Sequence, residues 1–390
     1  MKSIAAACIW LLSLSFGMTA NDGLSLPLVL KDEKPVSMLQ KALIAAHRMG
    51  AHSNLRLALM SNVSLPLVNV DFDVEYYVVL EVGTPGQKFK LNIDTGSADF
   101  WIYSVDCKTP ECLAHSRFNY SSSRTYKPLN KKWSMAYVDG SYVSGYQACD
   151  NVNIGGLVVK NQRMGLAIST SEDFKEDVID GMVGLSFQSV SRMQSPPLFH
   201  NMIAQNLLSK PIFSVWLGKR SEGGDGEITF GGTNPAHYKG NLTWSPVVEQ
   251  RYWSVFTDGV IMNGKFIKAA GPAIVDTGST ILILPSDVAN KVHGQIPGSR
   301  NDPNWGWIIP CESASRFPKM ELGFRIGGKF FNIPLVDLIR EPMKSNKGMC
   351  FSAIIASISG PWLLGAVFIK NNYCVFDAGR LQIGIAPAKR

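Results

Sequence analysis

The sequence is poor in charge and lacks the motifs that hold phosphates, metals or nucleic acids. Asp, Glu, Lys and Arg make up only 18% of its 390 residues, too small a share for a long disordered polar tail. It contains no glycine-rich phosphate loop, no zinc-like Cys/His spacing and no basic tract. We therefore expect no metal, no organic cofactor and no nucleic acid partner.

A second long apolar span is also missing, as is a GPI-like tail. The first residues run from Met1-Lys2 through an apolar stretch to Thr19-Ala20, which predicts a secretory signal peptide over residues 1–20. A membrane anchor is the competing interpretation, but the apolar run is short and polar residues follow it. We expect a secreted product without a membrane anchor, with a vacuolar or lysosomal address as the alternative.

A repeated tetrapeptide is the most informative feature that is present. Residues 94–97 and 276–279 both read Asp-Thr-Gly-Ser, and each copy follows a short apolar run. This pattern indicates a strand, a tight turn in which Gly takes backbone angles that a Cβ forbids, and a second strand. Gly184 and Gly365 each end an apolar-apolar-Gly element at nearly the same interval after the two Asp residues. The pattern predicts a duplicated lobe that brings Asp94 and Asp276 face to face.

With these motifs the chain resembles the pepsin-like aspartic endopeptidases, from about Tyr76 to the C-terminus, and most of all their fungal secreted members. The resemblance implies an all-β, bilobal acid protease fold with two related β-barrel-like lobes and the active-site cleft between them. The length of 390 residues also exceeds one ordinary core. The expected lobes are residues 71–240, with Asp94 and a flap, and residues 241–390, with Asp276.

Two touching carboxyl groups can supply both a base and an acid for peptide hydrolysis, because like charges in contact share one proton. By resemblance, Asp94 and Asp276 are the catalytic pair of an aspartic endopeptidase, and the flanking residues brace and orient them. These supporting residues are Thr95, Gly96, Ser97, Thr277, Gly278 and Ser279. A serine nucleophile is the weaker interpretation, because neither serine has a plausible His and Asp relay.

Residues 133–146 contain an Asp-Gly turn between two strand-like runs, which predicts a β-hairpin. By resemblance this hairpin is the flap that closes over substrate, and the cleft prefers bulky hydrophobic side chains on both sides of the cut. The expected substrate-binding residues are Tyr137, Asp139, Trp101, Ile179 and Ile274, with Ile93 as a further candidate. Asp139 is either a contact for a substrate Lys or simply the residue that the turn favours.

Two positions depart from the family pattern. Val138 stands beside the flap tyrosine where Gly is common, and Ala366 follows Gly365 where Asp is frequent. The alternative function is therefore a catalytically silent pepsin-like protein that binds a peptide or a partner without cutting it. The intact Asp-Thr-Gly motifs favour the peptidase.

Residues 21–70 are expected to form a prosegment. An amphipathic helix is predicted over residues 37–49, and the segment is rich in Lys and Arg. A cationic cover suits a carboxylate-lined cleft and fails when the carboxylates are protonated. The expected partners are thus polypeptide substrates, this prosegment as an inhibitor, and pepstatin-type inhibitors, acting on a monomer. A merely solvated arm is the alternative.

Seven cysteines are present, and six remain once Cys8 leaves with the signal peptide. By spacing and resemblance we expect disulfides between Cys107 and Cys112 and between Cys311 and Cys350. Cys149 and Cys374 are left over, either paired with each other, present as thiols, or exchanged into another pairing. Asn-X-Ser/Thr sequons, which predict a glycoprotein, begin at Asn62, Asn119 and Asn241.

Overall fold

The computed structural model of the protein describes residues 61–70, 73, 75–136 and 141–390. The predicted signal peptide, residues 21–60 of the predicted prosegment, and the hairpin residues Tyr137, Val138 and Asp139 lie outside the described residues.

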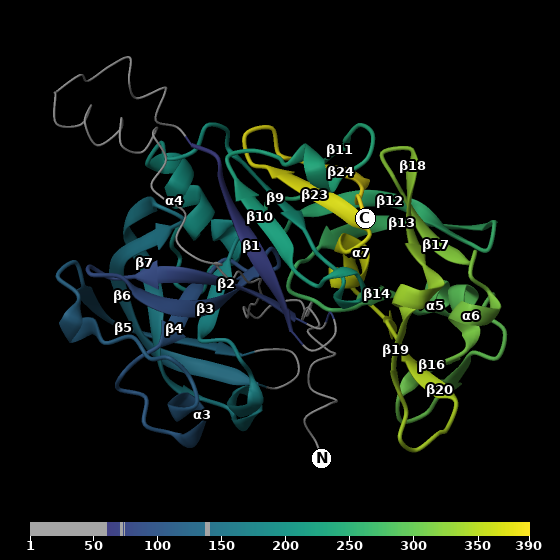
Figure 1. Ribbon diagram of the computed structural model, residues 1–390, viewed down its shortest axis with the longest axis horizontal. Coiled ribbons are helices and arrows are strands. Elements are labelled where there is room, and N and C mark those ends of the chain that lie inside the picture. Colours follow the sequence, from purple (N-terminus) through teal and green to yellow (C-terminus); the bar gives the residue numbers. More distant parts are fainter. Residues whose placement is uncertain (1–60, 71–72, 74, 137–140) are drawn as a thin grey trace.

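Strands dominate the described chain, as the predicted all-β fold requires (Figure 1). The largest sheet has 13 strands. In spatial order they are β11 (Thr243–Pro246), β24 (Gln382–Pro387), β23 (Asn372–Asp377), β9 (Ile212–Trp216), β10 (Gly226–Phe230), β1 (Val63–Val70), β2 (Glu75–Val82), β3 (Gln87–Asp94), β8 (Gly181–Gly184), β4 (Phe100–Tyr103), β7 (Leu157–Thr170), β6 (Tyr142–Ile154) and β5 (Lys127–Ala136).

Two further sheets build the other side of the molecule. The first, with seven strands, runs in the order β18 (Lys329–Pro334), β17 (Glu321–Ile326), β12 (Ser254–Met262), β13 (Lys265–Val275), β22 (Trp362–Leu364), β14 (Leu282–Pro285) and β21 (Ile354–Ser357). The second, with four strands, consists of β15 (Arg300–Asp302), β16 (Gly306–Pro310), β20 (Met349–Ser352) and β19 (Ile339–Pro342).

The α-helices of the described chain are short. They are α3 (Pro110–Leu113), α4 (Leu198–Ala204), α5 (Ser286–His293), α6 (Ser313–Arg316) and α7 (Ala366–Ile369). None of the helices that the structure describes has the length and apolarity needed to cross a bilayer.

The two lobes repeat one strand arrangement around their Asp motifs. In the first lobe, β3 runs parallel to β8, which in turn pairs antiparallel with β4. In the second lobe, β13 runs parallel to β22, which pairs antiparallel with β14. The outer neighbours also match, because β4 is parallel to β7 and β14 is parallel to β21. The duplication predicted from the motif spacing is therefore present in the hydrogen-bonded topology.

The lobes are not separate sheets, however. Strands β11, β23 and β24 come from residues 241–390, yet β23 pairs with β9 and thereby joins the sheet that contains β3. These strands lie in the middle of the molecule, between the lobe on the left of Figure 1 and the lobe on the right. The central part of the large sheet thus connects the two halves of the chain.

The predicted hairpin exists as the strand pair β5 and β6, in register from Trp133 opposite Gly145 to Ala136 opposite Tyr142. Its inner side packs on a separate aromatic cluster around Trp101. The ring of Trp101 lies 6.2 Å from that of Trp133 and 5.9 Å from that of Phe174, measured between centroids. Burial of these large rings stabilises the base of the hairpin against the lobe.

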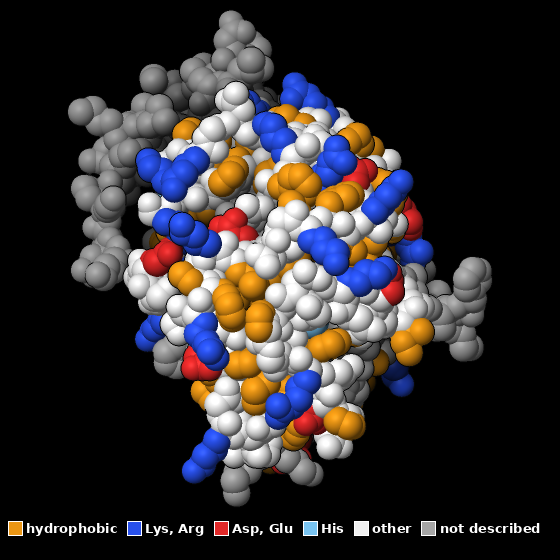
Figure 2. Space-filling model, turned by 90° about the vertical axis from the view of Figure 1, so that its right-hand side faces the viewer, with side chains coloured by type: hydrophobic (Ala, Val, Ile, Leu, Met, Phe, Trp, Pro, Cys, Tyr) orange, Lys and Arg blue, Asp and Glu red, His pale blue; other side chains and the backbone are white. Residues whose placement is uncertain are grey.

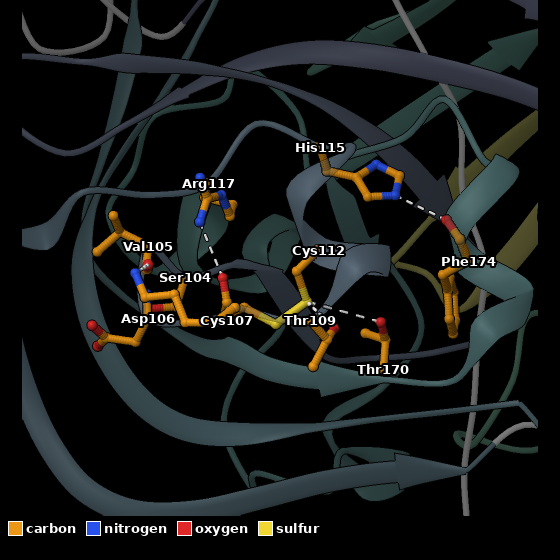
Figure 3. Close-up of a disulfide and its surroundings, with 11 residues drawn as sticks. Ser104, Val105, Asp106, Cys107, Thr109, Cys112, His115, Arg117, Thr170 and Phe174 are labelled. Atoms are coloured by element: carbon orange, nitrogen blue, oxygen red, sulfur yellow. Dashed lines mark hydrogen bonds between the residues drawn. A yellow bond between two sulfur atoms is a disulfide. The ribbon is translucent and has the colours of Figure 1, made fainter.

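Both predicted disulfides are present, Cys107–Cys112 and Cys311–Cys350. Figure 3 shows the first of them next to α3, where Arg117 donates to the Cys107 carbonyl oxygen and the His115 ring contacts the Phe174 carbonyl oxygen. The alternative left open by the sequence is also decided, because Cys149 and Cys374 are buried free thiols.

The surface of the second lobe carries dispersed positive charge. Figure 2 views the molecule from that side, and Lys and Arg side chains lie scattered among hydrophobic ones, with Asp and Glu less frequent. The sequence as a whole has a formal net charge of +7. On this face the positive charge is not gathered in one patch (Figure 2). Nucleic acid binding would favour a single basic patch.

Candidate active site

Asp94 and Asp276 occupy equivalent turns at the ends of equivalent strands. Asp94 is the last residue of β3, and Asp276 directly follows β13. Each turn is closed by its own carboxylate: the Gly96 amide donates to Asp94 Oδ1 at 2.6 Å, and the Gly278 amide donates to Asp276 Oδ1 at 2.9 Å. Both carboxyl groups are therefore held rigidly at strand ends.

Glycine is required where the two motifs meet their neighbours. A Cβ on Gly184 would lie 2.5 Å from the Ala98 backbone, and a Cβ on Gly365 would lie 2.2 Å from the Ser279 carbonyl oxygen. A Cβ on Gly96 would lie 2.8 Å from Asp276 Oδ1, so the second carboxyl group rests directly against the first turn. These close approaches give the repeated glycines their physical reason.

Thr95 and Thr277 join the two turns by reciprocal hydrogen bonds. The Thr95 hydroxyl donates to the Val275 carbonyl oxygen at 2.8 Å, and the Thr277 hydroxyl donates to the Ile93 carbonyl oxygen at 3.0 Å. Each backbone amide also donates to the other hydroxyl, at 3.0 Å and 2.9 Å. Since all these groups are buried, the four bonds fix the relative position of the two carboxyl groups.

The carboxyl pair is buried, with Asp94 0% and Asp276 7% exposed. Burial, reinforced by the adjacent Asp276 carboxyl, raises the pKa of Asp94 well above its ordinary value. Burial also raises the pKa of Asp276, against the opposing effect of its hydrogen bonds with Asp94, Gly278 and Ser279. The environment thus favours one proton shared by the pair, so that one group can act as an acid while the other acts as a base.

The two motif serines differ. The Ser279 hydroxyl donates to Asp276 Oδ2 at 2.8 Å. The Ser97 hydroxyl and Asp94 Oδ2, both buried, have no partner in good hydrogen-bond geometry among the described residues. Ser97 still lowers the pKa of Asp94, but only the second carboxyl group has its motif serine in good hydrogen-bond geometry.

The other predicted substrate-binding residues differ in their positions relative to the two carboxyl groups. Trp101 is fully buried beneath the hairpin, and Ile179 and Ile274 are each 2% exposed. Strand alternation puts Ile274 on the same face as Asp276, whereas Ile93 points the other way and belongs to the main hydrophobic core. The prediction that Ile93 lines the cleft is therefore wrong. Tyr137 and Asp139 lie outside the described residues.

Asn92 is a candidate site residue that the sequence reasoning missed. It lies two residues before Asp94 on β3, so its side chain shares the face of the catalytic candidate, and it is fully buried. Its amide group donates to Glu75 Oε1. Applying the period of two along residues 91–94 would have identified Asn92 instead of Ile93.

Within the described residues, no group of three or more His, Cys, Asp or Glu side chains is arranged to hold a metal ion. The chemistry that the geometry supports is proton transfer between two buried carboxyl groups and a reactant in contact with both.

Known proteins are similar in sequence to most of the chain. The family model described as eukaryotic aspartyl protease matches residues 75–388. Syncephapepsin of Syncephalastrum racemosum is 39% identical over 328 residues, which cover 84% of this chain and 80% of that protein. Rhizopuspepsin-1 of Rhizopus niveus is 36% identical over 394 residues, covering 99% and 98%. Pepsin A of Rhinolophus ferrumequinum is 34% identical over 388 residues, covering 97% and 99%.

Proposed function

The chain belongs to the eukaryotic aspartyl protease family, and from this premise we propose that Asp94 and Asp276 are its catalytic pair. The protein is an aspartic endopeptidase, and its substrates are polypeptides. The observation that carries the residue assignment is the contact between two buried carboxyl groups on turns locked together by Thr95 and Thr277.

In this mechanism a water molecule held between the carboxyl groups attacks the scissile carbonyl carbon. The ionised carboxylate takes a proton from the water while the protonated carboxyl gives its proton to the carbonyl oxygen. Rigid turns and buried surroundings keep both groups in place during the transfer. Ser279 supports Asp276 by its hydrogen bond, and Tyr137 and Asp139 are proposed, from the resemblance alone, to contact the substrate.

The specificity that this site favours is for bulky hydrophobic side chains. Ile274 lies on the face of Asp276, and Ile179 supplies another apolar side chain in the first lobe. Removing apolar substrate surface from water at such a wall favours binding.

The test combines an inhibitor with two nearly isosteric variants. The purified precursor is acidified and incubated with denatured globin, with and without pepstatin. Wild type should cleave globin and pepstatin should block it, whereas Asp94→Asn and Asp276→Asn should fold with at least a thousandfold loss of kcat, because neither retains a proton-sharing pair. Turnover like that of wild type in either variant would refute the assignment. Intact globin in the wild-type reaction would favour the silent binding protein.

The N-terminal region is proposed to act in secretion and latency. Residues 1–20 are a signal peptide that directs a monomeric protein out of the cell, or to a vacuole or lysosome, and an inhibitory prosegment lies within residues 21–70. Strand β1 pairs with both β10 and β2, so cleavage near Ser61 would keep this strand in the mature enzyme. Asn119 and Asn241 are exposed and available to glycans.

The maturation step has its own test. N-terminal sequencing after acidification should find a new terminus within residues 61–71, toward Ser61. If the Asp94→Asn precursor matures equally fast by itself, another protease performs the cut.

A further inference from the structure

Four charged side chains form ion pairs between the two lobes. The Lys370 ammonium lies 2.9 Å from Asp73 Oδ2, and the Lys219 ammonium lies 2.7 Å from Asp337 Oδ2. Lys370 also approaches Asp337 Oδ1 at 3.9 Å, which links the two pairs. Asp73 and Lys219 belong to the first lobe. Asp337 and Lys370 belong to the second, so both pairs cross from one lobe to the other. We call these four residues the interlobe network.

The interlobe network is largely shielded from water, since its four side chains are only 7% to 15% exposed. Asn371 completes it. The Asn371 amide oxygen accepts a hydrogen bond from Lys219 at 2.9 Å, and its amide nitrogen donates to Asp337 Oδ2 at 2.9 Å. Each buried charge therefore has a partner of opposite sign, and removing one partner would leave the other charge buried and unpaired, which is strongly destabilising.

The second-lobe end of the network is attached to the turn that carries Asp276. Lys370 is the C-cap of the short helix α7. At the other end of this helix, the Ala366 amide donates to the Ser279 carbonyl oxygen at 2.6 Å. One helical turn thus separates Lys370 from the residues that follow Asp276.

The first-lobe end leads to the strand that carries Asp94. Asp73 lies two residues before Glu75, the first residue of β2. Glu75 accepts a hydrogen bond from Asn92, which shares the face of Asp94 on β3. The interlobe network therefore connects, through one helix and one strand, the backbone segments that present the two carboxyl groups.

Polar and charged groups surround the carboxylate of Asp73. Its Oδ1 accepts hydrogen bonds from Asn69 Nδ2 at 2.6 Å and from the Arg220 amide at 2.7 Å. The Tyr76 phenol and the Arg390 guanidinium also interact electrostatically with both carboxylates of the network.

These surroundings make the network sensitive to acid. Burial disfavours the ionised form of Asp73, but the Lys370 ammonium and the hydrogen bonds to Asp73 outweigh burial and lower the pKa of this carboxyl group. The resulting stabilisation is present above the pKa that Asp73 has in the unfolded chain. It is lost as the pH falls through the lower pKa of the folded protein.

We propose that the interlobe network is an acid-sensitive clamp, which positions the Asp94 and Asp276 turns relative to each other and loosens when its carboxylates are protonated. The inference rests on the proposed function, because positioning matters only if both carboxyl groups act on one substrate. The clamp adds a second connection between the turns to that of the threonine bonds. Unlike those bonds it depends on charge, and it sets the lower pH limit of the enzyme.

The first test is a double-mutant cycle on the pair Asp73 and Lys370. Asp73→Asn, Lys370→Met and the double variant are made in the Asp94→Asn precursor, to prevent self-digestion. At pH 6 each single variant should lower the thermal unfolding midpoint by about 5–10 °C, because a buried charge loses its partner. The double variant should lose less than the sum. At pH 2 this coupling should be much smaller, because Asp73 is then protonated.

The pair Asp287 and Lys291 provides the matched control. Its charged atoms are 2.8 Å apart, as in the clamp, but the two side chains are 63% and 56% exposed. The same cycle with Asp287→Asn and Lys291→Met should therefore show little coupling at either pH.

The second test separates positioning from stability alone. In the active enzyme, assayed at pH 5 and well below the unfolding midpoint, Asp73→Asn should lower kcat on a hydrophobic peptide roughly fivefold with little change in KM, because misplaced carboxyl groups react more slowly. Lys370→Arg, which can keep the ion pair, should retain the wild-type kcat, as should Asp287→Asn.

The outcomes separate the two proposals. Additive losses in the cycle at pH 6, coupling that persists at pH 2, or a wild-type kcat in Asp73→Asn overturns the inference alone. Failure of wild type to cleave any peptide overturns the proposed function, and the positioning role with it.

Discussion

In the first lobe Asp94 shares its strand face with Asn92, whereas in the second lobe Asp276 shares its face with Ile274. The backbone around the two is the same, since β3 pairs with β8 as β13 pairs with β22. The duplicated topology therefore fixes where the carboxyl groups lie, and the side chains around them are free to differ.

The largest effect is expected from the reciprocal hydrogen bonds of Thr95 and Thr277. Removing either hydroxyl group tests whether the two turns support each other equally. Thr95→Val and Thr277→Val each remove one hydroxyl that both donates and accepts, leaving two buried backbone groups unpaired. Each variant should lose about 3 kcal/mol of unfolding free energy. Chemical denaturation of both variants and of the double variant checks this, and the double variant should lose less than the sum. Strongly unequal losses would show that the two turns do not brace each other equally.

Removing the hydroxyl group of Ser97 or of Ser279 should have unequal effects on activity in the two lobes. Ser279→Ala removes a hydrogen bond to Asp276, so kcat/KM should fall roughly tenfold, whereas Ser97→Ala, which removes no well-formed bond, should change it less. The lost bond favoured the ionised form of Asp276, so its pKa should rise. Ser97 lowers the pKa of Asp94 in the same sense, so the acidic limb of the pH profile should move to higher pH in both variants, and further in Ser279→Ala. Matching profiles for the two variants would contradict the asymmetry.

Acidic pH should lower the stability of the second lobe through the protonation of His293, the last residue of α5. Burial lowers the pKa of His293 to about 4, although its bond to the Ala289 carbonyl oxygen acts the other way. An unfolded His binds a proton near pH 6.5 and this folded one does not, so stability is full above that pH and declines as the pH falls toward 4.

At pH 5.5 this linkage should cost roughly 1 kcal/mol relative to pH 7.5. The variant His293→Gln should lose less stability over the same pH interval, measured by thermal unfolding. His200→Gln is the comparison in the first lobe, where burial lowers the pKa of His200 as well. An equal decline in wild type and His293→Gln would rule out this source of acid sensitivity.

The smallest effect on activity is expected from giving β3 the side chain that β13 has at the equivalent position, Ile in place of Asn92. Asn92→Ile removes the donor to Glu75 and places an apolar side chain on the face of Asp94. Cleavage should shift toward more hydrophobic substrates by a few-fold in kcat/KM ratio, the size that one apolar contact gives. The measurement is competition between Leu- and Ser-containing peptides. An unchanged ratio would mean that Asn92 does not face the bound peptide.

Repeated local patterns were sufficient to predict the strands that carry the Asp motifs and the hairpin below its tip, whereas both disulfides were predicted from cysteine spacing together with the family resemblance. The side-chain direction at the site was not read correctly, because Ile93 was chosen by its position next to Asp94 and the alternation that selects Asn92 was not applied. The pairing of β23 with β9 was also out of reach, because contacts between residues such as Cys374 and Val215 leave no local signature. For the same reason the sequence left the state of Cys374 open.

The position of β23 has a consequence for how the chain can acquire its structure during synthesis. Strand β9 pairs with β10 on one side and with β23 on the other, and β23 leaves the ribosome long after both of them. Until then the first lobe presents an unpaired edge at β9, and such edges favour association with other chains. Any C-terminal truncation that removes β23 should therefore yield an aggregating product instead of an isolated first lobe.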